Sequence, residues 1–312
     1  MKETNKEKKL IEFSILVDQD VADLVGNALI GLLPDGLVAE RIYDGVFPHE
    51  LDLVTGPVRI FGFFPQEEEG TYRSEIEKIL QDLRTKIDLP NPAYSSLENK
   101  NWAAAWQERY HPIPLGEKLI VVPSWLENPQ PGRIPIFIDP GMAFGSGVHE
   151  TTQLCLILLE DALSEQPSTE MIDVGCGSGI LSIAAAKLGV KQILGVDSEP
   201  EAIRVSVENA KKNGVKSSAN FASGSVAEIL SGKLPLSTAS LVVANIIAPI
   251  LEELFQVGLG ELVPVNGRLI LSGILQNQMA SILNCLEMEG FEVKTRKKEG
   301  EWIAVLAEKT PK

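Results

Sequence analysis

Residues 171–181 of the chain are Met171-Ile-Asp-Val-Gly175-Cys-Gly177-Ser-Gly179-Ile-Leu181. The apolar start predicts a buried strand, the three glycines predict a tight turn, and the stretch from Leu181 to Leu188 predicts a helix. Glycines in such a turn let the backbone come close to a ligand at the N-terminus of the helix. We therefore expect a ligand-binding turn between a strand and a helix, in which Gly177 and Gly179 allow the close approach.

A second apolar strand is predicted over residues 192–197, and it ends in Asp197. An acid at that strand end accepts hydrogen bonds from both hydroxyls of a ribose. The glycines before it are spaced G-x-G-x-G, whereas the dinucleotide fingerprint is G-x-G-x-x-G, and position 180 is Ile. This spacing favours a mononucleoside cofactor over a dinucleotide. A glycine turn without a ligand is the alternative, but it leaves Asp197 unexplained.

Strands and helices alternate through the C-terminal part of the chain. Strands are predicted over residues 119–123, 171–175, 192–197, 218–223, 240–246 and 267–272, and helical stretches separate most of them. That alternation is typical of an α/β fold with a mostly parallel, doubly wound, Rossmann-like sheet and helices on both faces. Residues 291–296 and 302–307 flank a charged turn and predict an antiparallel hairpin that closes the sheet.

The N-terminal part has a different pattern. Strands are predicted over residues 11–17, 37–43 and 57–64, and helices over 20–33 and 71–87. This order suggests a smaller α+β domain, ferredoxin-like in topology. We expect an N-terminal substrate-recognition domain over 1–95, a linker over 96–118 and a second domain over 119–312.

The stretch from about 88 to 118, which includes the expected linker, carries Trp102 and Trp106 at helical spacing and four prolines, Pro90, Pro92, Pro112 and Pro114. The prolines indicate a connecting segment, and the tryptophan pair predicts a short amphipathic helix that docks on another surface. Two interpretations stay open for these rings. They pack the linker onto a domain, or they contact a substrate.

Composition places limits on function. The 312 residues are 44% hydrophobic and 23% charged, as in a two-domain globular protein. A net charge of -15 raises the cost of approaching a polyphosphate backbone, so we expect no direct nucleic-acid partner. Three scattered cysteines and three histidines suggest no disulfide framework and no metal. No signal-peptide core and no apolar run of about 18 residues is found, so we expect a cytoplasmic protein without a membrane segment.

With its closing hairpin, this arrangement resembles the class I S-adenosylmethionine-dependent methyltransferases, over roughly residues 119–308. A second motif narrows the resemblance. It is Ile138-Asp139-Pro140-Gly141-Met-Ala-Phe144-Gly145-Ser-Gly147-Val-His149-Glu-Thr151-Thr152, a glycine-rich loop that we expect to end in a helix cap at Thr151 or Thr152. Its pattern, D-P-G-x-A-F-G-x-G-x-H-x-T-T, resembles the methyltransferases of large-subunit ribosomal protein eleven.

Strand 240–246 leads into a third motif, Val242-Val-Ala-Asn245-Ile-Ile-Ala-Pro249. Amino-directed methyltransferases place here a polar residue that holds the attacking nitrogen. An amide at the end of a buried strand is costly unless it has partners. The alternative is that Asn245 caps the following helix. No aromatic residue follows, which argues against a flipped nucleobase as substrate.

The family resemblance implies S-adenosylmethionine as cofactor, with Thr152, Gly175, Asp197 and Asn245 contacting it and Asn245 also orienting the attacking amine. It implies that Phe144 shields the sulfonium from water. The adenine contact stays open, because Gly224-Ser225 offers a hydroxyl where many relatives carry an acid. His149 is a candidate for either a base or a positioning residue.

The implied reaction is methylation of lysine side chains, and of the α-amine, of ribosomal protein eleven, which the N-terminal domain would recognise. A methyltransferase acting on RNA or on another translation protein, and a cofactor-binding module without catalysis, are the alternatives.

Overall fold

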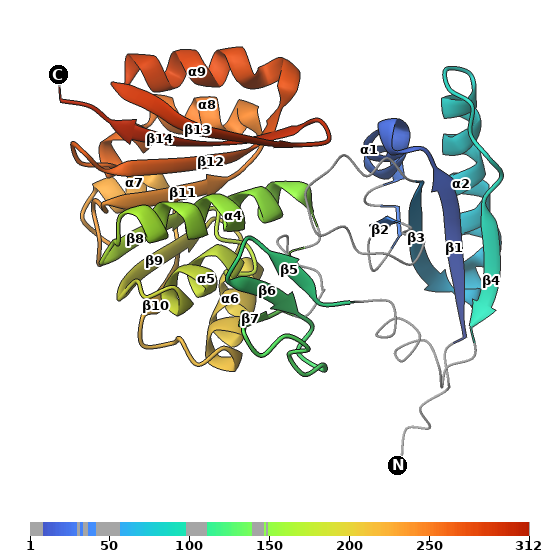
Figure 1. Cartoon of the computed structure of the whole chain (residues 1–312). Helices are drawn as coiled ribbons and strands as arrows, with labels where there is room; N and C mark the ends of the chain where they lie inside the picture. Colours follow the sequence, from blue (N-terminus) through green and yellow to red (C-terminus); the bar gives the residue numbers. More distant parts are fainter. Residues whose placement is uncertain are drawn as a thin grey trace. The chain divides into compact units, whose positions relative to one another are not determined.

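The computed structural model describes residues 9–29, 32–33, 37–41, 57–97, 111–138, 147 and 149–311. The chain divides into two compact units, residues 1–110 and 111–312, which are coloured blue to cyan and green to red in Figure 1. Among the described helices, none has the length and apolar character needed to cross a membrane.

The first unit contains a four-stranded sheet with strand order β2-β3-β1-β4, and all three strand pairs are antiparallel. Its elements are β1 (Leu10–Val17), α1 (Gln19–Leu29), β2 (Leu37–Arg41), β3 (Val58–Pro65), η1 (Gln66–Glu68), α2 (Glu69–Arg84) and β4 (Ala93–Leu97). This β-α-β-β-α-β order with β1 and β3 central is the predicted ferredoxin-like arrangement. Strand β4 was not predicted, because Pro90 and Pro92 closely precede it.

Alternation along β1 explains how this sheet holds its helices. Ile11, Phe13 and Ile15 are buried, and they share one hydrophobic cluster with Val25 of α1 and Ile76 of α2. Side chains of a strand point to opposite faces in turn, so one face of β1 packs on both helices.

The second unit is built on a seven-stranded sheet with strand order β10-β9-β8-β11-β12-β14-β13. The strands are β8 (Glu170–Val174), β9 (Gln192–Asp197), β10 (Ala219–Ser223), β11 (Leu241–Asn245), β12 (Arg268–Leu275), β13 (Phe291–Glu299) and β14 (Trp302–Lys309). The five strands β10, β9, β8, β11 and β12 are each parallel to their neighbours in that order. Strand β14 lies between β12 and β13 and is antiparallel to both. The doubly wound sheet and its closing antiparallel hairpin are therefore confirmed.

Helices cover both faces of this sheet (Figure 1). One face packs on α4 (Glu150–Glu165), α5 (Ile180–Lys187) and α6 (Pro200–Lys212), and the other on α7 (Val226–Leu230), α8 (Ala248–Gln256) and α9 (Met279–Met288). Short 3-10 turns, η2 (Leu259–Leu262) and η3 (Gln276–Gln278), join the last elements. Consecutive residues divide between the layers, since Met171 belongs to the first cluster and Ile172 to the second. The two-sided apolar strands thus hold three layers together.

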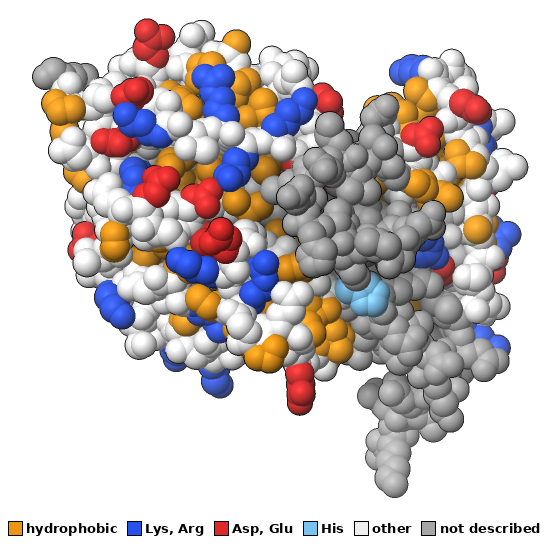
Figure 2. Space-filling model, viewed as in Figure 1, with side chains coloured by type: hydrophobic (Ala, Val, Ile, Leu, Met, Phe, Trp, Pro, Cys, Tyr) orange, Lys and Arg blue, Asp and Glu red, His pale blue; other side chains and the backbone are white. Residues whose placement is uncertain are grey.

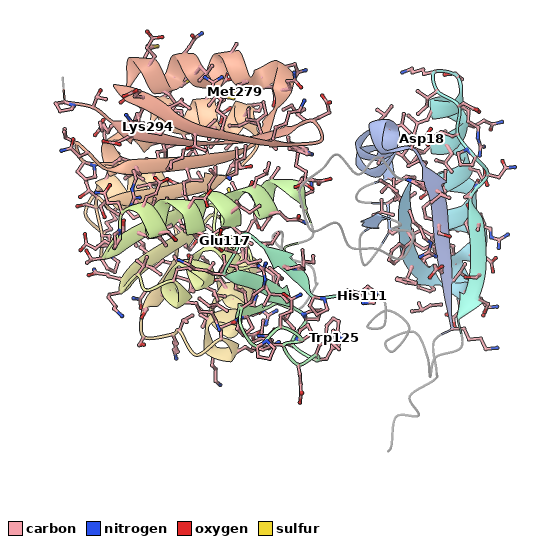
Figure 3. All side chains as sticks on the ribbon, viewed as in Figure 1. Asp18, His111, Glu117, Trp125, Met279 and Lys294 are labelled. Carbon is pink, nitrogen blue, oxygen red and sulfur yellow. The ribbon has the colours of Figure 1, made fainter. Side chains whose placement is uncertain are left out.

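The strand predicted over 119–123 does not join the large sheet. It is β6 (Leu119–Val122), which pairs antiparallel with β5 (Ile113–Leu115) and parallel with β7 (Ile134–Phe137) in a sheet of its own. His111, labelled in Figure 3, precedes β5, so the last part of the expected linker enters this sheet.

The buried carboxylate of Glu160 in α4 holds the turn between β5 and β6. It accepts hydrogen bonds from the backbone N–H groups of Glu117, Lys118 and Leu119 at 2.8–3.2 Å. Three N–H donors satisfy a buried charge that would otherwise be costly in the middle of a helix. The small sheet is in this way fixed to the helix that begins at the predicted site.

Candidate active site

The predicted site residues Gly175, Asp197 and Asn245 lie at one edge of the large sheet. Each stands at the carboxyl end of a strand, and β8 lies between β9 and β11, parallel to both. The chain runs outward from β8 to β9 and β10 and then returns to β11 on the other side of β8. In doubly wound sheets, ligands bind at this point of reversal, outside the carboxyl ends of the strands.

The glycine turn after β8 depends on backbone conformations that favour glycine. Gly175, Gly177 and Gly179 have φ values of 70°, 52° and 79°. A Cβ atom on Gly179 would lie 2.9 Å from the Cβ of Ser206, and Gly179 is also the residue before α5. The turn therefore brings bare backbone to the N-terminus of a helix, which is a favourable place for a polar ligand.

Asp197 joins the glycine turn to the next strand. One carboxylate oxygen accepts the N–H of Gly177 at 2.9 Å, and the other accepts the N–H of Glu199 at 3.0 Å. An ionised carboxylate has about four acceptor positions, so each oxygen keeps one for another donor. The geometry suits a pair of ribose hydroxyls.

Asn245 and Thr152, 93 positions apart in the chain, meet at the same edge. The amide nitrogen of Asn245 donates to the hydroxyl oxygen of Thr152 at 3.3 Å. The amide oxygen of Asn245 is buried and has no hydrogen-bond partner among the described residues. Such an oxygen costs about 1–3 kcal/mol when it stays unpaired, so a ligand donor there would recover that energy. Asn245 does not cap the following helix, because the N-cap of α8 is Ile247.

The helix cap predicted at Thr151 or Thr152 is wrong by two or three positions. Helix α4 begins at Glu150, and its N-cap is His149, whose Nδ1 accepts the N–H of Thr151 at 3.3 Å and lies 2.9 Å from the Thr151 hydroxyl. Both threonines are buried in the first helical turn. The rule that favours short polar caps gave the correct helix end but the wrong residue. The His149 ring also packs edge-to-face on Trp302, at a centroid distance of 5.2 Å.

Asp173 was not predicted as a site residue, and it proves to organise the turn. Its side chain is fully buried, and Oδ2 accepts the N–H of Ser182 at 3.1 Å and the Ser182 hydroxyl at 2.7 Å. Burial raises the pKa of Asp173 to about 6, against the lowering effect of the Ser182 hydrogen bonds. The signal was present in the sequence as a lone carboxylate inside an apolar strand.

Two further predictions have different outcomes. Phe144, like Trp102 and Trp106, lies outside the described residues. Ser225, the hydroxyl offered for adenine, donates to the carboxylate of Glu228 at 2.6 Å in the capping box of α7. That hydroxyl is already used as a donor.

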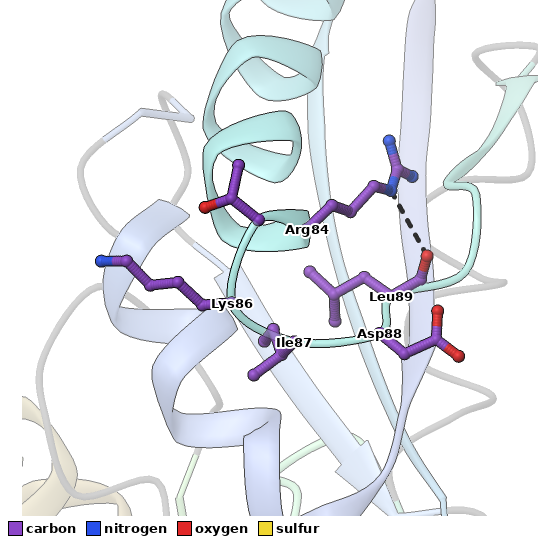
Figure 4. A pocket seen from close by; sticks show the side chains of 6 residues that line it. Arg84, Lys86, Ile87, Asp88 and Leu89 are labelled. Carbon is purple, nitrogen blue, oxygen red and sulfur yellow. Dashed lines mark hydrogen bonds between the residues drawn. The ribbon is translucent and has the colours of Figure 1, made fainter.

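A shallow hollow of about 410 Å³ lies in the first unit, at the loop after α2 (Figure 4). Six consecutive residues, 84–89, line it, and Arg84 Nε donates to the carbonyl of Leu89 at 3.3 Å. It contains none of the predicted site residues. We assign no function to it, because a loop folded on itself accounts for its shape.

Basic and acidic side chains are interspersed on the face of the second unit drawn in Figure 2. Lys297 of β13 pairs with Asp161 of α4 at 3.0 Å, and Lys294 pairs with Glu292 at 2.6 Å. These exposed pairs contribute little to stability. They do place acids beside the lysines of β13.

Comparisons with known proteins agree with this geometry. The family model described as ribosomal protein L11 methyltransferase (PrmA) matches residues 9–310. A relative of that name from Pelotomaculum thermopropionicum is 38% identical over 255 residues, covering 81% of this chain and 80% of the relative. Another, from Desulfosudis oleivorans, is 34% identical over 313 residues, covering 97% of each chain.

A solved structure leads to the same family. It is the ribosomal protein L11 methylase from Lactobacillus delbrueckii subsp. bulgaricus, with a TM-score of 0.57 and 34% identity. The match covers 65% of this chain and 100% of that one. The family model spans nearly the whole chain, and the relatives exceed 30% identity over most of it. The chain therefore belongs to the ribosomal protein L11 methyltransferase family.

Proposed function

We propose that this methyltransferase transfers methyl groups from S-adenosylmethionine to amino groups, chiefly lysine side chains, of ribosomal protein L11. The observation that carries the proposal is the buried, unpaired amide oxygen of Asn245 at the same sheet edge as the glycine turn and Asp197. An acceptor placed there suits an amine donor beside a bound nucleoside. The names of the relatives support L11 as the substrate.

The residues at this edge fit S-adenosylmethionine. Asp197 keeps acceptor positions for the ribose hydroxyls, and the glycine turn leaves bare backbone at the start of α5. The hydrogen bond to Thr152 fixes the orientation of the Asn245 amide, and therefore the direction in which its oxygen can accept a hydrogen bond. When bound, S-adenosylmethionine would supply an electrophilic methyl group on a sulfonium.

The protein's main task in such a reaction is placement. Methyl transfer is a direct displacement, so Asn245 would hold the amine nitrogen in line with the methyl group. A free lysine has a pKa near 10.4, and loss of water around it favours the neutral, nucleophilic form. No protein nucleophile is needed, and burial raises the pKa of the Cys155 and Cys176 thiols, which keeps both protonated. His149 serves as the cap of α4, and solvent would take the proton.

We further propose that the first unit recognises the substrate and that the expected linker, residues 96–118, connects it to the catalytic unit, although β4 and β5 take up the two ends of that segment. Methylation of several amino groups on one protein would need docking separate from the catalytic edge. The ferredoxin-like sheet and its two helices form their own core, which supports an independent role.

The test is incubation of the purified chain with L11, ribosomal RNA and labelled S-adenosylmethionine, followed by mass spectrometry of the modified residues. We expect label on lysine of L11. Asn245→Ala should lower kcat about 10²-fold, whereas Asn220→Ala, at an exposed position in β10 of the same sheet, should not change it. Label in RNA alone, or an unchanged rate in Asn245→Ala, would contradict the proposal.

The proposed roles of the two units, substrate recognition and catalysis, are tested with a fragment. A fragment starting at residue 111 keeps β5 and the whole second unit. It should bind S-adenosylmethionine as tightly as the full chain does, by calorimetry, but should lose L11 methylation. Undiminished methylation by the fragment would show that the first unit is not the docking domain.

A further inference from the structure

Ile246, the residue after Asn245, fits between two glycines that are far from it in sequence. A Cβ atom on Gly175 would lie 2.7 Å from Cδ1 of Ile246, and a Cβ atom on Gly273 would lie 2.4 Å from its carbonyl oxygen. Its N–H donates to the carbonyl of Ser272 at 3.1 Å. The side chain of this one residue therefore contacts the glycine turn, and its carbonyl and N–H contact β12.

The contact with Gly273 comes from an irregularity in β12. The pairing of β12 with β14 shifts register between Leu271 and Ile274, and Gly273, inside the shift, has a φ of 84°. An irregularity of this kind, such as a β-bulge, bends the strand that carries it. Because Gly273 has no side chain, the 246–247 peptide lies directly against its Cα, and no L-residue could take that place without moving the peptide.

The contact with Gly175 reaches the first residue of the glycine turn. Gly175 also donates its N–H to the carbonyl of Val196 at 2.9 Å, which ties it to the strand ending in Asp197. The Ile246 side chain therefore closes the turn on one side, while β9 holds it on the other.

We propose that Ile246 is a positioning residue that sets the distance and angle between the glycine turn and the Asn245 amide. The proposal rests on the function proposed above, in which Asn245 orients the amine beside a nucleoside held by the turn. Ile246 itself touches neither reacting group. Gly175 and Gly273 are needed as glycines partly because Ile246 occupies the space of their side chains.

Gly273→Ala tests the link to Asn245. Ordinary contact begins at 3.4 Å, so the added Cβ would push the Ile246 carbonyl by about 1 Å from 2.4 Å. A displacement of that size can lower a rate about 10²-fold, so we expect kcat to fall by about that factor. KM for S-adenosylmethionine should change less, because Asp197 and its contacts are not displaced.

Gly214→Ala is the matched control. Gly214 follows α6, has a similar φ of 72°, and a Cβ atom there would meet nothing within 4 Å. It should lower the melting temperature through backbone strain alone and leave kcat unchanged. Equal loss of kcat in both glycine variants would mean that strain explains the result, and would overturn the proposal.

A double-mutant cycle tests the link to the turn. Gly175→Ala should weaken the affinity for S-adenosylmethionine, measured by calorimetry, because its Cβ displaces Cδ1 of Ile246. Adding Ile246→Ala removes that obstacle, so the double variant should bind about tenfold more tightly than Gly175→Ala alone. Additive effects of the two substitutions on affinity would overturn the proposal.

The two proposals fail in distinguishable ways. If the wild-type chain binds S-adenosylmethionine but does not methylate L11, the proposed substrate is wrong, and the affinity cycle still decides the role of Ile246. If L11 is methylated and the effects of Gly175→Ala and Ile246→Ala on affinity are additive, the proposed substrate is supported and the positioning role of Ile246 is contradicted.

Discussion

Two aspartates near the ends of neighbouring strands have different roles. Asp173 is the second-last residue of β8, and Asp197 is the last residue of β9. Asp173 is fully buried and receives hydrogen bonds from Ser182 in α5, whereas Asp197 is half-buried and receives them from loop N–H groups. A difference of one position relative to the end of the strand therefore separates a carboxylate that fixes a helix from one that remains accessible to a ligand.

The difference also appears in their electrostatics. Burial is the largest cause that raises the pKa of Asp173 to about 6, and the charge of Asp197 raises it further, while the two Ser182 hydrogen bonds lower it. One oxygen of Asp173 is buried without a partner among the described residues. Asp173 is therefore a costly structural charge, whereas Asp197 can use its free acceptor positions for binding.

The largest effect we predict is the loss of the accessible carboxylate. Asp197→Ala would remove the two charge-assisted hydrogen bonds that we propose Asp197 makes to the ribose, each worth about 1.5–3 kcal/mol, so the affinity for S-adenosylmethionine should fall about 10³-fold. Calorimetry measures this. Asp161→Asn, a surface aspartate in α4 paired with Lys297, is the control and should bind normally. Normal binding by Asp197→Ala would remove the distinction between the two aspartates.

A smaller effect is predicted for the pH dependence of stability. The pKa of Asp173 is raised from 3.8 to about 6 on folding, so the folded state holds this proton more tightly. Its stabilising contribution is complete below pH 3.8 and is lost as pH rises through about 6. Over that window the unfolding free energy of the wild type should fall by about 3 kcal/mol relative to Asp173→Asn.

Denaturant unfolding at several pH values measures this difference. The comparison must be made between variants at each pH, because other groups titrate in the same range. Asp161→Asn, which removes an exposed carboxylate, serves again as control and should follow the wild type. If the difference in unfolding free energy between wild type and Asp173→Asn stayed constant with pH, ionisation of Asp173 would not destabilise the folded state.

The candidate site residues were predicted from the sequence in two ways. The glycine turn and Asp197 each follow directly from a strand whose apolar run ends there, so local pattern was enough to select them, whereas Asn245 was selected through the family resemblance. The parallel pairing of β9, β8 and β11 then brought them together. A general rule of doubly wound sheets supplies that step without knowledge of any contact.

The residues that sequence missed depend on contacts between distant segments. Gly273 matters because the peptide of Ile246 lies against it, and nothing near position 273 indicates that contact. The partner strands of β6 could not be predicted either, since an apolar run fixes a strand but not its neighbours. His149 as a cap required the ring orientation, which its contact with Trp302 supports.

Ser182→Ala gives the smallest predicted effect and the sharpest test of why Asp173 is tolerated. It removes the hydroxyl that donates to Oδ2 at 2.7 Å and keeps the backbone donor at 3.1 Å. The unfolding free energy at pH 7 should fall by about 1.5 kcal/mol, the value of one hydrogen bond to a charge. Because that hydroxyl lowers the pKa of Asp173, the pH at which the stability changes should also move upward.

Ser206→Ala is the control. It removes a buried hydroxyl that donates to the carbonyl of Ile203 in its own helix, so it should lower the unfolding free energy less and leave the pH of the stability change in place. If both serine variants behaved alike, Asp173 would be held by the fold around it and not by Ser182.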